Sequence, residues 1–213
     1  MARARGGGSD AGRLDEYRRR RRFDRTAEPG GGDRVETGER PVFVVQLHDA
    51  SRMHFDFRLE ADGVLKSWAV PKGPSADPHV KRFAARTEDH PLDYRTFEGV
   101  IAKGEYGGGT VMVWDEGTFQ NLTTDRSGEQ VPLGKAVEEG HASFRLQGHK
   151  LHGAYALTRM RGDEGKEQWL LVKKTDRHAK ADKSTDPQRL RSARSGRTLR
   201  RIAADAAADG GGR

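Results

Sequence analysis

The chain has 213 residues, of which 33% are hydrophobic and 33% are charged, and this composition allows one domain with a modest core between polar flanks. It contains no cysteine, which excludes disulfides, thiolate metal sites and cysteine nucleophiles, and no apolar run approaches the roughly 18 residues that span a bilayer. The net charge of +7 is carried by the ends, since residues 1–40 hold +3, 41–172 hold −3 and 173–213 hold +7. We therefore expect a cytoplasmic, nucleoid-associated protein with no membrane contact. Its basic ends are expected to bind the phosphate backbone of a nucleic acid.

The first forty residues contain one candidate helix. Residues 1–12 are rich in glycine and are expected to form a disordered tail. The stretch RLDEYRRRRRF at 13–23 predicts a short helix, with its five arginines at 18–22 exposed. The glycine and proline content of 26–41 indicates a linker or an ordered loop.

Short runs of β-type residues, separated by glycine-rich turns, begin at residue 42. The strongest turn signal is Asp62-Gly63, which is typical of a two-residue hairpin. The predicted strands cover 42–48, 53–60, 64–71, 82–88, 110–119 with a turn at Asp115 to Gly117, 142–148, 154–160 and 168–174. Residues 133–140 favour one or two helical turns. Eight short strands with little helix are typical of a mainly β sandwich or closed antiparallel barrel, and we predict the barrel.

The domain prediction follows from these elements. A barrel domain is expected over 13–175, and a basic, Ala/Gly-rich flexible tail over 176–213. The pattern near 186–207 is compatible with a frayed helix, but no core requires one.

Histidine, aspartate and arginine alternate along the stretch MHFDFRLE at 53–60. His54, Asp56 and Arg58 share one face of this strand, and the other face is apolar, with Met53, Phe55, Phe57 and Leu59. Same-face neighbours lie about 6.6 Å apart, so His54 and Asp56 can converge on one divalent cation, and a short connection can fold His48 back beside them. Two imidazoles and one carboxylate leave coordination positions open, which favours a catalytic site holding Mn²⁺, Fe²⁺ or Zn²⁺.

Other polar residues are candidates for contact with a phosphate. Arg58 offers a planar fork suited to two oxygens of a phosphate or carboxylate. A protonated His90 would stabilise phosphate charge or protonate a leaving group. Ser67 and Lys72 are polar residues within reach of a phosphate. The stretch KGEYGGGT at 103–110 lacks the Gly-Lys-Ser/Thr ending of a phosphate loop and predicts a tight turn.

Three long stretches, in this order, resemble the 3′-phosphoesterase module of bacterial DNA ligase D. They are FVVQLHDASRMHFDFRLEADGVLKSWAVPKGPS at 43–75, EDHPLDYRTFEGVIAKGEYGGGTVMVWDEGTF at 88–119 and WLLVKK at 169–174. The resemblance covers about 13 to 176. No Lys-x-Asp-Gly adenylation motif of a ligase occurs in the sequence, so the expectation is a free-standing version of the module.

The resemblance implies a Mn²⁺-dependent barrel enzyme that removes a 3′-terminal ribonucleoside and then the 3′-phosphate, leaving a 3′-OH for repair. Its partners would be DNA 3′ ends, as primer-template or RNA-tipped DNA, with a DNA ligase and a Ku-type end-binding protein. By motif match the metal ligands are His48, His54 and Asp56. The catalytic residues would be Arg58 and His90, which hold the scissile phosphate, and Tyr94. Substrate-binding positions would be Gln46, Ser67, Lys72, Arg82, Glu88 and Glu28.

The N-terminal part of the family pattern matches less closely. The stretch RRFDRTAEP at 21–29 aligns Glu28, but Arg22 stands where the family has an acidic residue. The family ties that acid and the glutamate to ribonucleoside removal. We therefore expect this step to be weaker than phosphate removal, with Asp24 as an acid in a shifted position.

Two other functions compete with this interpretation. His54-x-Asp56 has the spacing of a non-haem iron oxygenase, which takes its second histidine far downstream, here from His141, His149 or His152. The second alternative is a non-catalytic nucleic-acid-binding repair scaffold.

Overall fold

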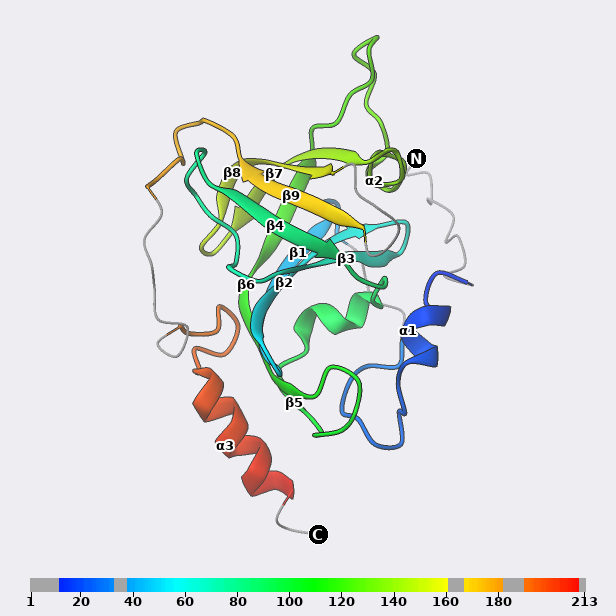
Figure 1. The fold of residues 1–213 in the computed structure, drawn as a ribbon, viewed down its shortest axis with the longest axis vertical. Coiled ribbons are helices and arrows are strands. Elements are labelled where there is room, and N and C mark those ends of the chain that lie inside the picture. The colour runs from blue at the N-terminus through cyan, green and yellow to red at the C-terminus, as the bar shows by residue number, and fades with distance from the viewer. Residues whose placement is uncertain (1–11, 33–37, 161–166, 182–189, 211–213) are drawn as a thin grey trace.

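A computed structural model describes residues 12–32, 38–160, 167–181 and 190–210 (Figure 1). The strands are β1 Val42–Asp49, β2 Met53–Ala61, β3 Val64–Val70, β4 Lys81–Arg86, β5 Gly99–Ile101, β6 Gly109–Asn121, β7 His141–Gly148, β8 His152–Arg159 and β9 Gln168–Lys173. The helices are α1 Asp15–Arg19, the 3₁₀ helix η1 Leu92–Thr96, α2 Leu133–Glu139 and α3 Leu199–Gly210.

Eight of the strands form a closed antiparallel barrel, which confirms the predicted fold. Their order is β1-β2-β3-β4-β9-β8-β7-β6, and pairing of β1 with β6 closes the circle. The ninth strand, β5, adds to the other edge of β6 over three residues. The β2–β3 hairpin turns at Asp62 and Gly63, whose φ angles of 55° and 79° match the two left-handed positions that its Asp-Gly sequence predicts.

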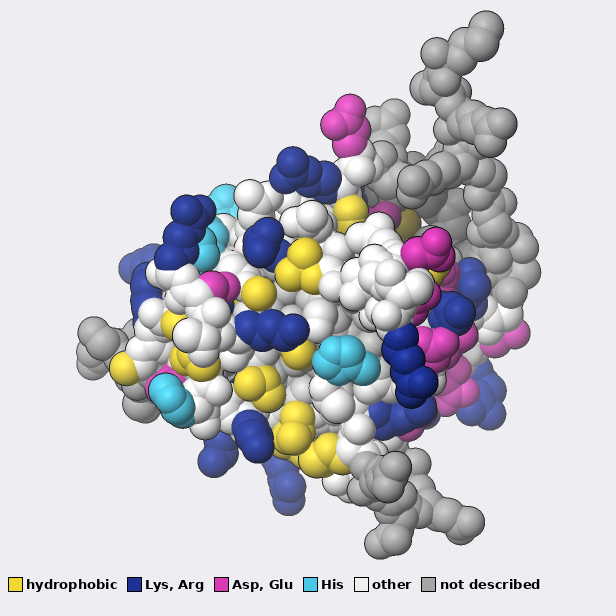
Figure 2. Space-filling model, turned by 90° about the horizontal axis from the view of Figure 1, so that it is seen from above, with side chains coloured by type: hydrophobic (Ala, Val, Ile, Leu, Met, Phe, Trp, Pro, Cys, Tyr) yellow, Lys and Arg dark blue, Asp and Glu magenta, His cyan; other side chains and the backbone are white. Residues whose placement is uncertain are grey.

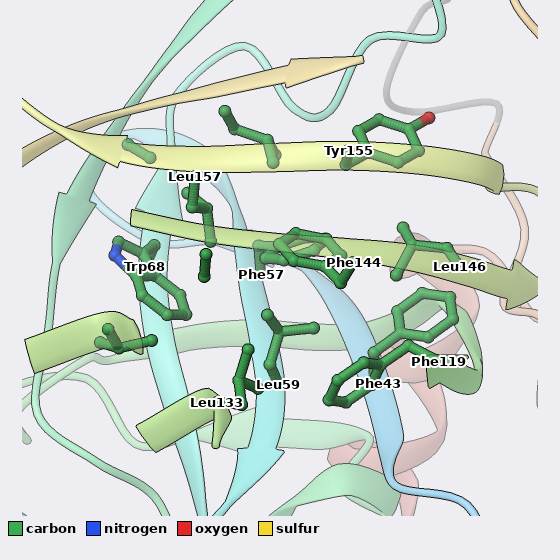
Figure 3. Close-up of a cluster of buried hydrophobic side chains, with 14 of the residues drawn as sticks. Phe43, Phe57, Leu59, Trp68, Phe119, Leu133, Phe144, Leu146, Tyr155 and Leu157 are labelled. Carbon is green, nitrogen blue, oxygen red and sulfur yellow. The ribbon is translucent and has the colours of Figure 1, made fainter. Parts of the chain in front are cut away.

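The barrel interior is filled by large apolar side chains that alternate with outward-facing ones along each strand. Figure 3 shows Phe57 and Leu59 of β2 facing Phe144 and Leu157 of the opposite wall. The short helix α2 contributes Leu133 to the same cluster. Burying each such side chain stabilises the fold by about 1.5–3 kcal/mol, so the apolar face of β2 is committed to the core.

A second apolar cluster lies outside the barrel. Helix α1, η1 and β5 pack here against β1, β3 and β6, on the side away from β8 and β9 (Figure 1). Tyr17 and Tyr94 are buried in this cluster, at 0% and 2% exposure. The outward face of β2, with its polar residues, therefore lies next to this second layer and not in the barrel interior.

The opposite side of the barrel carries scattered basic and apolar side chains (Figure 2). Strands β4 and β9 pair here with Phe83 directly opposite Leu170. Phe83 remains 42% exposed. Acidic side chains gather mainly at one edge of the view in Figure 2.

The predicted turn at Asp115 to Gly117 is wrong, because β6 runs through these residues. The pairing of β1 with β6 shifts there between Val45 and Gln46, which marks a β-bulge. The Asp115 carboxylate is buried and accepts backbone N–H bonds from residues 149, 150 and 151. Gly117 is needed for close packing, since a Cβ there would lie 2.1 Å from the Gln147 carbonyl oxygen. The bulge leaves Trp114 unpaired with β1, and Asp115 and Gly117 continue the strand beyond it.

The structure also differs from the predicted tail after residue 176. Helix α3 packs against β5 and β6, and its Leu199 and Ile202 are buried against Leu47 and Met112. No local pattern predicts this packing, because those partners lie 87 or more positions earlier in the chain. Within the described part of the chain, none of the helices has both the length and the apolar character needed to span a bilayer.

We expect Ile202→Ala to destabilise the protein. Ile202 is 1% exposed, and removing a buried isoleucine side chain typically lowers the free energy of unfolding by about 2–4 kcal/mol. Arg200→Ala, two residues earlier and exposed, should change it by less than about 0.5 kcal/mol. Urea denaturation of both variants measures the difference. Equal stabilities would show that α3 does not pack on the barrel in solution.

Candidate active site

The side chains of His48, His54 and Asp56 meet on the outward face of β1 and β2. His48 and His54 are directly paired across the two strands, with ring centroids 4.9 Å apart. One ligand atom from each of the three residues lies within 4.8 Å of the other two. Asp56 is two residues along β2 from His54, on the same face. This set, called the His-His-Asp group below, has the donor atoms and spacing to hold one divalent cation.

Two backbone carbonyls orient the two imidazole rings. His48 donates from Nε2 to the carbonyl of Gly107 over 2.8 Å, and His54 donates from Nδ1 to the carbonyl of Arg52 over 2.9 Å. A carbonyl only accepts, so these nitrogens donate a hydrogen, and the other ring nitrogens are the ones that face Asp56. The free nitrogens, His48 Nδ1 and His54 Nε2, lie 3.5 and 3.6 Å from the Asp56 carboxylate. Carbonyl bonds of this kind are the usual outer-shell support of metal-binding histidines.

The electrostatics keep Asp56 ionised. Burial opposes its charged form, but Arg58, with His48 and His54, outweighs burial and holds the pKa of Asp56 well below its usual value. Burial also lowers the pKa of His54, but the hydrogen bond and charge of Asp56 raise it further, so the net shift is upward. A cation at this group would compete with a proton on His54. Its binding would therefore strengthen as the pH rises through that pKa.

Arg58 lies next to the group and is buried at 2% exposure. Its Nε donates to Gln46 Oε1 over 2.8 Å, and its Nη2 lies 3.2 Å from Asp56. Gln46 is itself fixed, because its amide nitrogen donates to the carbonyls of Tyr94 and Phe97. The remaining nitrogen, Arg58 Nη1, is buried and has no hydrogen-bond partner among the described residues.

His90 is neutral in the free protein, contrary to the sequence-based expectation of a protonated ring. Its Nδ1 donates to the carbonyl of Glu88 over 2.9 Å, and its Nε2 accepts from Arg21 Nη2 over 3.2 Å. Burial, followed by the positive charges of Arg58 and Arg21, holds the pKa of His90 well below its usual value. Its ring contacts that of Tyr94, with centroids 4.8 Å apart.

The sequence reasoning missed Arg21, and the expectation that all five arginines at 18–22 are exposed is wrong there. The Arg21 side chain is 5% exposed and forms ion pairs with Glu28 and Glu88 at 2.9 and 3.1 Å. Its guanidinium also lies 3.8 Å from the ring centroid of Tyr17. A buried guanidinium needs such partners. Tyr17 stands four residues earlier, the spacing that would place both residues on one face of the predicted helix 13–23, but α1 ends at Arg19 and Arg21 lies after it.

Glu28 lies beneath the N-terminal segment and joins it to η1. Its carboxylate accepts from the Tyr94 hydroxyl over 3.0 Å and from Thr26 over 2.9 Å. Burial, then the charge of Glu28, raises the pKa of Tyr94 well above its usual value, so Tyr94 stays protonated. The Tyr94 ring centroid lies 5.0 Å from the Arg58 guanidinium carbon. Glu28 and Tyr94 therefore fix the wall of the site around Arg58.

Ser67 is buried near His90, 3.4 Å from its Nδ1. Two other predicted residues lie further out. Lys72 is exposed, just after β3, and Arg82 lies on β4, which β3 separates from β2. The contacts above join ten of the twelve predicted site residues, and Lys72 and Arg82 are the two that they do not include.

The histidines required by the oxygenase alternative do not join the group. His141 and His152 begin β7 and β8, and His149 lies between them in the chain. Among the described residues, only His48 meets His54 and Asp56 at ligand spacing. The geometry does not support an oxygenase.

A pocket of about 870 Å³ lies elsewhere, and its lining includes Arg40, Glu60 and Phe119. These residues lie at the ends of β1, β2 and β6 that are remote from His48 and His54. The pocket contains no histidine, so its size alone does not make it the reactive site.

Comparison with known proteins identifies a consistent set of relatives. Residues 46–159 match the model of the DNA Ligase D 3′-phosphoesterase domain. The chain is 50% identical over 171 residues to the multifunctional non-homologous end joining protein LigD of Pseudomonas aeruginosa, covering 79% of this chain and 19% of that protein. It is 44% identical over 160 residues to the multifunctional non-homologous end joining DNA repair protein LigD of Mycobacterium tuberculosis, covering 75% of this chain and 19% of the relative. The chain spans about a fifth of the length of these relatives.

Proposed function

We propose that this chain, which belongs to the DNA ligase D 3′-phosphoesterase domain family, is a metal-dependent enzyme. It would process the 3′ ends of DNA strands during repair. Its substrates are a primer strand that ends in a 3′-phosphate and one that ends in a ribonucleotide. The product is a 3′-OH that a ligase or polymerase can use. The enzyme would act on chromosomal DNA in the cytoplasm, together with a DNA ligase and a Ku-type end-binding protein.

The single observation that carries this proposal is the free Nη1 of Arg58. A buried N–H without a partner costs about 1–3 kcal/mol, and more for a charged group. Arg58 is held against Asp56 on one side and Gln46 on another. An oxygen of a phosphoryl group beside the His-His-Asp group would satisfy the free N–H, since guanidinium groups bind phosphate through directed, charge-assisted bonds.

The His-His-Asp group fits a transition metal such as Mn²⁺. Its mixed nitrogen and oxygen donors match the preference of such ions, and a carbonyl bond to each imidazole leaves the other ring nitrogen directed toward Asp56. When bound, the ion would polarise a phosphoryl oxygen and lower the pKa of an attacking water.

The protein's own residues would bind the phosphate and move a proton. Arg58 holds one phosphoryl oxygen, and Gln46 keeps its guanidinium in place. Burial and the positive charges of Arg58 and Arg21 hold the pKa of His90 low, and the negative charge of an arriving phosphate would offset those charges. We expect His90 then to take up a proton at Nε2, where it now accepts from Arg21. That proton stabilises the phosphoryl charge or passes to the leaving oxygen.

Ribonucleoside removal is proposed to be the weaker activity. Arg22 forms an ion pair with Glu105, 2.6 Å apart, on the protein surface. Asp24 is exposed and lines a shallow pocket with Arg25 and Lys103. Arg22 thus stands where the family pattern has an acid and pairs with Glu105, and this is our reason to expect slower ribonucleoside removal.

The test is a gel assay with labelled primer-templates that end in a 3′-phosphate or in one 3′-ribonucleotide. We expect Mn²⁺ to support conversion of the 3′-phosphate to a 3′-OH, a chelator to stop it, and added Mn²⁺ to restore it. The ribonucleotide should be removed more slowly. Absence of phosphate release with every divalent metal would contradict the proposal and favour a non-catalytic scaffold. Equal rates on the two substrates would contradict the ranking of the activities.

A further inference from the structure

Tyr106 is an aromatic residue at the rim of the active site whose position the mechanism above does not use. It is 45% exposed and lies in the turn between β5 and β6. The next residue, Gly107, supplies the carbonyl that orients His48, over 2.8 Å. Because adjacent Cα atoms are about 3.8 Å apart, the Tyr106 side chain begins one residue from a direct contact with the His-His-Asp group.

Tyr106 is held in place by charged groups from two other segments. Arg20 donates to its hydroxyl, and the Arg20 guanidinium carbon lies 4.9 Å from the ring centroid. The hydroxyl also lies 3.5 Å from Glu88, which in turn pairs with the buried Arg21. Tyrosines usually bury the ring and leave the hydroxyl to water. Here the hydroxyl is occupied, and the Arg20 and Arg21 guanidinium carbons lie 4.9 and 5.5 Å from the ring centroid, so a ligand would contact the part of the ring that these arginines leave exposed.

A nucleotide whose 3′-phosphate lies at Arg58 needs a surface for its base. Stacking on an aromatic ring serves this purpose, because every base has a π-face and the contact is independent of sequence. The other exposed aromatic residues do not meet this need equally well. Phe83 lies on β4, opposite Leu170 on β9, and Phe23 packs toward Tyr17, with ring centroids 6.0 Å apart.

We propose that Tyr106 stacks on the terminal nucleobase of the strand whose 3′-phosphate is bound at Arg58. This inference rests on the proposed function and adds the basis of its substrate selection. Tyr106 would distinguish a phosphate on a nucleotide from a phosphate on a small alcohol. It contacts the base and not the reacting atoms, so its effect should appear mainly in KM.

The experiment compares Tyr106→Leu, Tyr106→Phe and wild type on two primer-templates with 3′-phosphates. One ends in a normal nucleotide and the other in an abasic residue. Tyr106→Leu should raise KM for the normal end by roughly 5- to 100-fold and leave the abasic end unchanged. Tyr106→Phe keeps the ring and should behave as wild type. Phe83→Leu, which removes an equally exposed ring from β4, should change neither substrate.

A binding measurement separates this inference from the proposed function. A primer with 2-aminopurine as its terminal 3′-phosphorylated nucleotide should lose fluorescence on binding wild type without metal, and less on binding Tyr106→Leu. Quenching without hydrolysis in any metal would overturn the proposed function and support stacking. Hydrolysis without quenching would overturn stacking alone. Two results would show that Tyr106 only connects Arg20 with Glu88. One is an equal rise in KM for the normal and the abasic end in Tyr106→Leu, and the other is a KM in Tyr106→Phe as high as in Tyr106→Leu.

Discussion

His54→Ala is expected to lower the release of phosphate from a 3′-phosphate primer-template by about a thousandfold, since metal-ion stabilisation of transition-state charge is worth several kcal/mol. The substitution removes one of three donors from the His-His-Asp group. The other two, His48 and Asp56, keep their contacts with Gly107 and Arg58. Initial rates over a range of Mn²⁺ concentrations measure the effect, and calorimetric titration with Mn²⁺ should show weaker binding.

The matched control is His79→Ala. The His79 side chain is 94% exposed and pairs with Asp77 two residues earlier, so its loss should leave both turnover and Mn²⁺ binding unchanged. The His54 side chain is 22% exposed, and the thermal unfolding midpoint of His54→Ala should stay close to wild type. Full activity in His54→Ala would remove the basis for a metal at this group.

Arg58→Lys is expected to lower turnover by at least about a hundredfold, the usual cost of losing one directed donor to a transition-state oxyanion. Lysine keeps the positive charge that holds the pKa of Asp56 low but loses the planar fork. It cannot reach Gln46, Asp56 and a phosphoryl oxygen together. Single-turnover rates at saturating Mn²⁺ separate this loss from a change in metal affinity.

Arg159→Lys serves as the control for an arginine-to-lysine change. Arg159 pairs with Glu167 at 3.3 Å and lies over Trp169 at the surface of β8, away from the His-His-Asp group. We expect wild-type turnover from this variant. If Arg58→Lys were as active as wild type, positive charge alone would suffice to bind the phosphate, and the Nη1 of Arg58 would have no special role.

The geometry around β2 could be predicted from the sequence because a strand has a period of two. The alternation of Phe55 and Phe57 with His54, Asp56 and Arg58 fixes two faces, and a short β1–β2 connection brings His48 opposite His54. These facts are local, since the residues lie within 11 positions of one another. The identity of any bound metal is not fixed by them.

The N-terminal wall of the site could not be derived in the same way. Arg21 is one of five consecutive arginines, and the run itself does not distinguish it from its neighbours, although its side chain is only 5% exposed. What selects it is a set of distant partners, Glu28, Glu88 and His90. A guanidinium enters the interior only where those acceptors already converge, and that convergence is a property of the tertiary structure.

Strand β5 was not predicted, and the packing of helix α3 was not predicted, for a related reason. Strand β5 has three residues, below the length at which alternation can be read. Helix α3 has the apolar spacing of Leu199 and Ile202 within an Ala-rich, basic segment, and this spacing is equally compatible with a frayed helix. Its stability depends on Leu47 and Met112, so tertiary packing decides the outcome.

Because β2 has one apolar and one polar face, the register that assembles the site is also the register that buries the core. If β2 paired with β1 one residue out of step, Phe57 and Leu59 would face solvent and Asp56 and Arg58 would enter hydrocarbon. Burying unpaired charges costs more than the roughly 5–15 kcal/mol that separates a folded domain from its unfolded chain. A molecule with this shifted β1–β2 register would therefore unfold and would not persist as a folded, inactive protein. A sample of this protein should accordingly contain folded, active molecules and unfolded molecules, with few molecules that are folded but inactive.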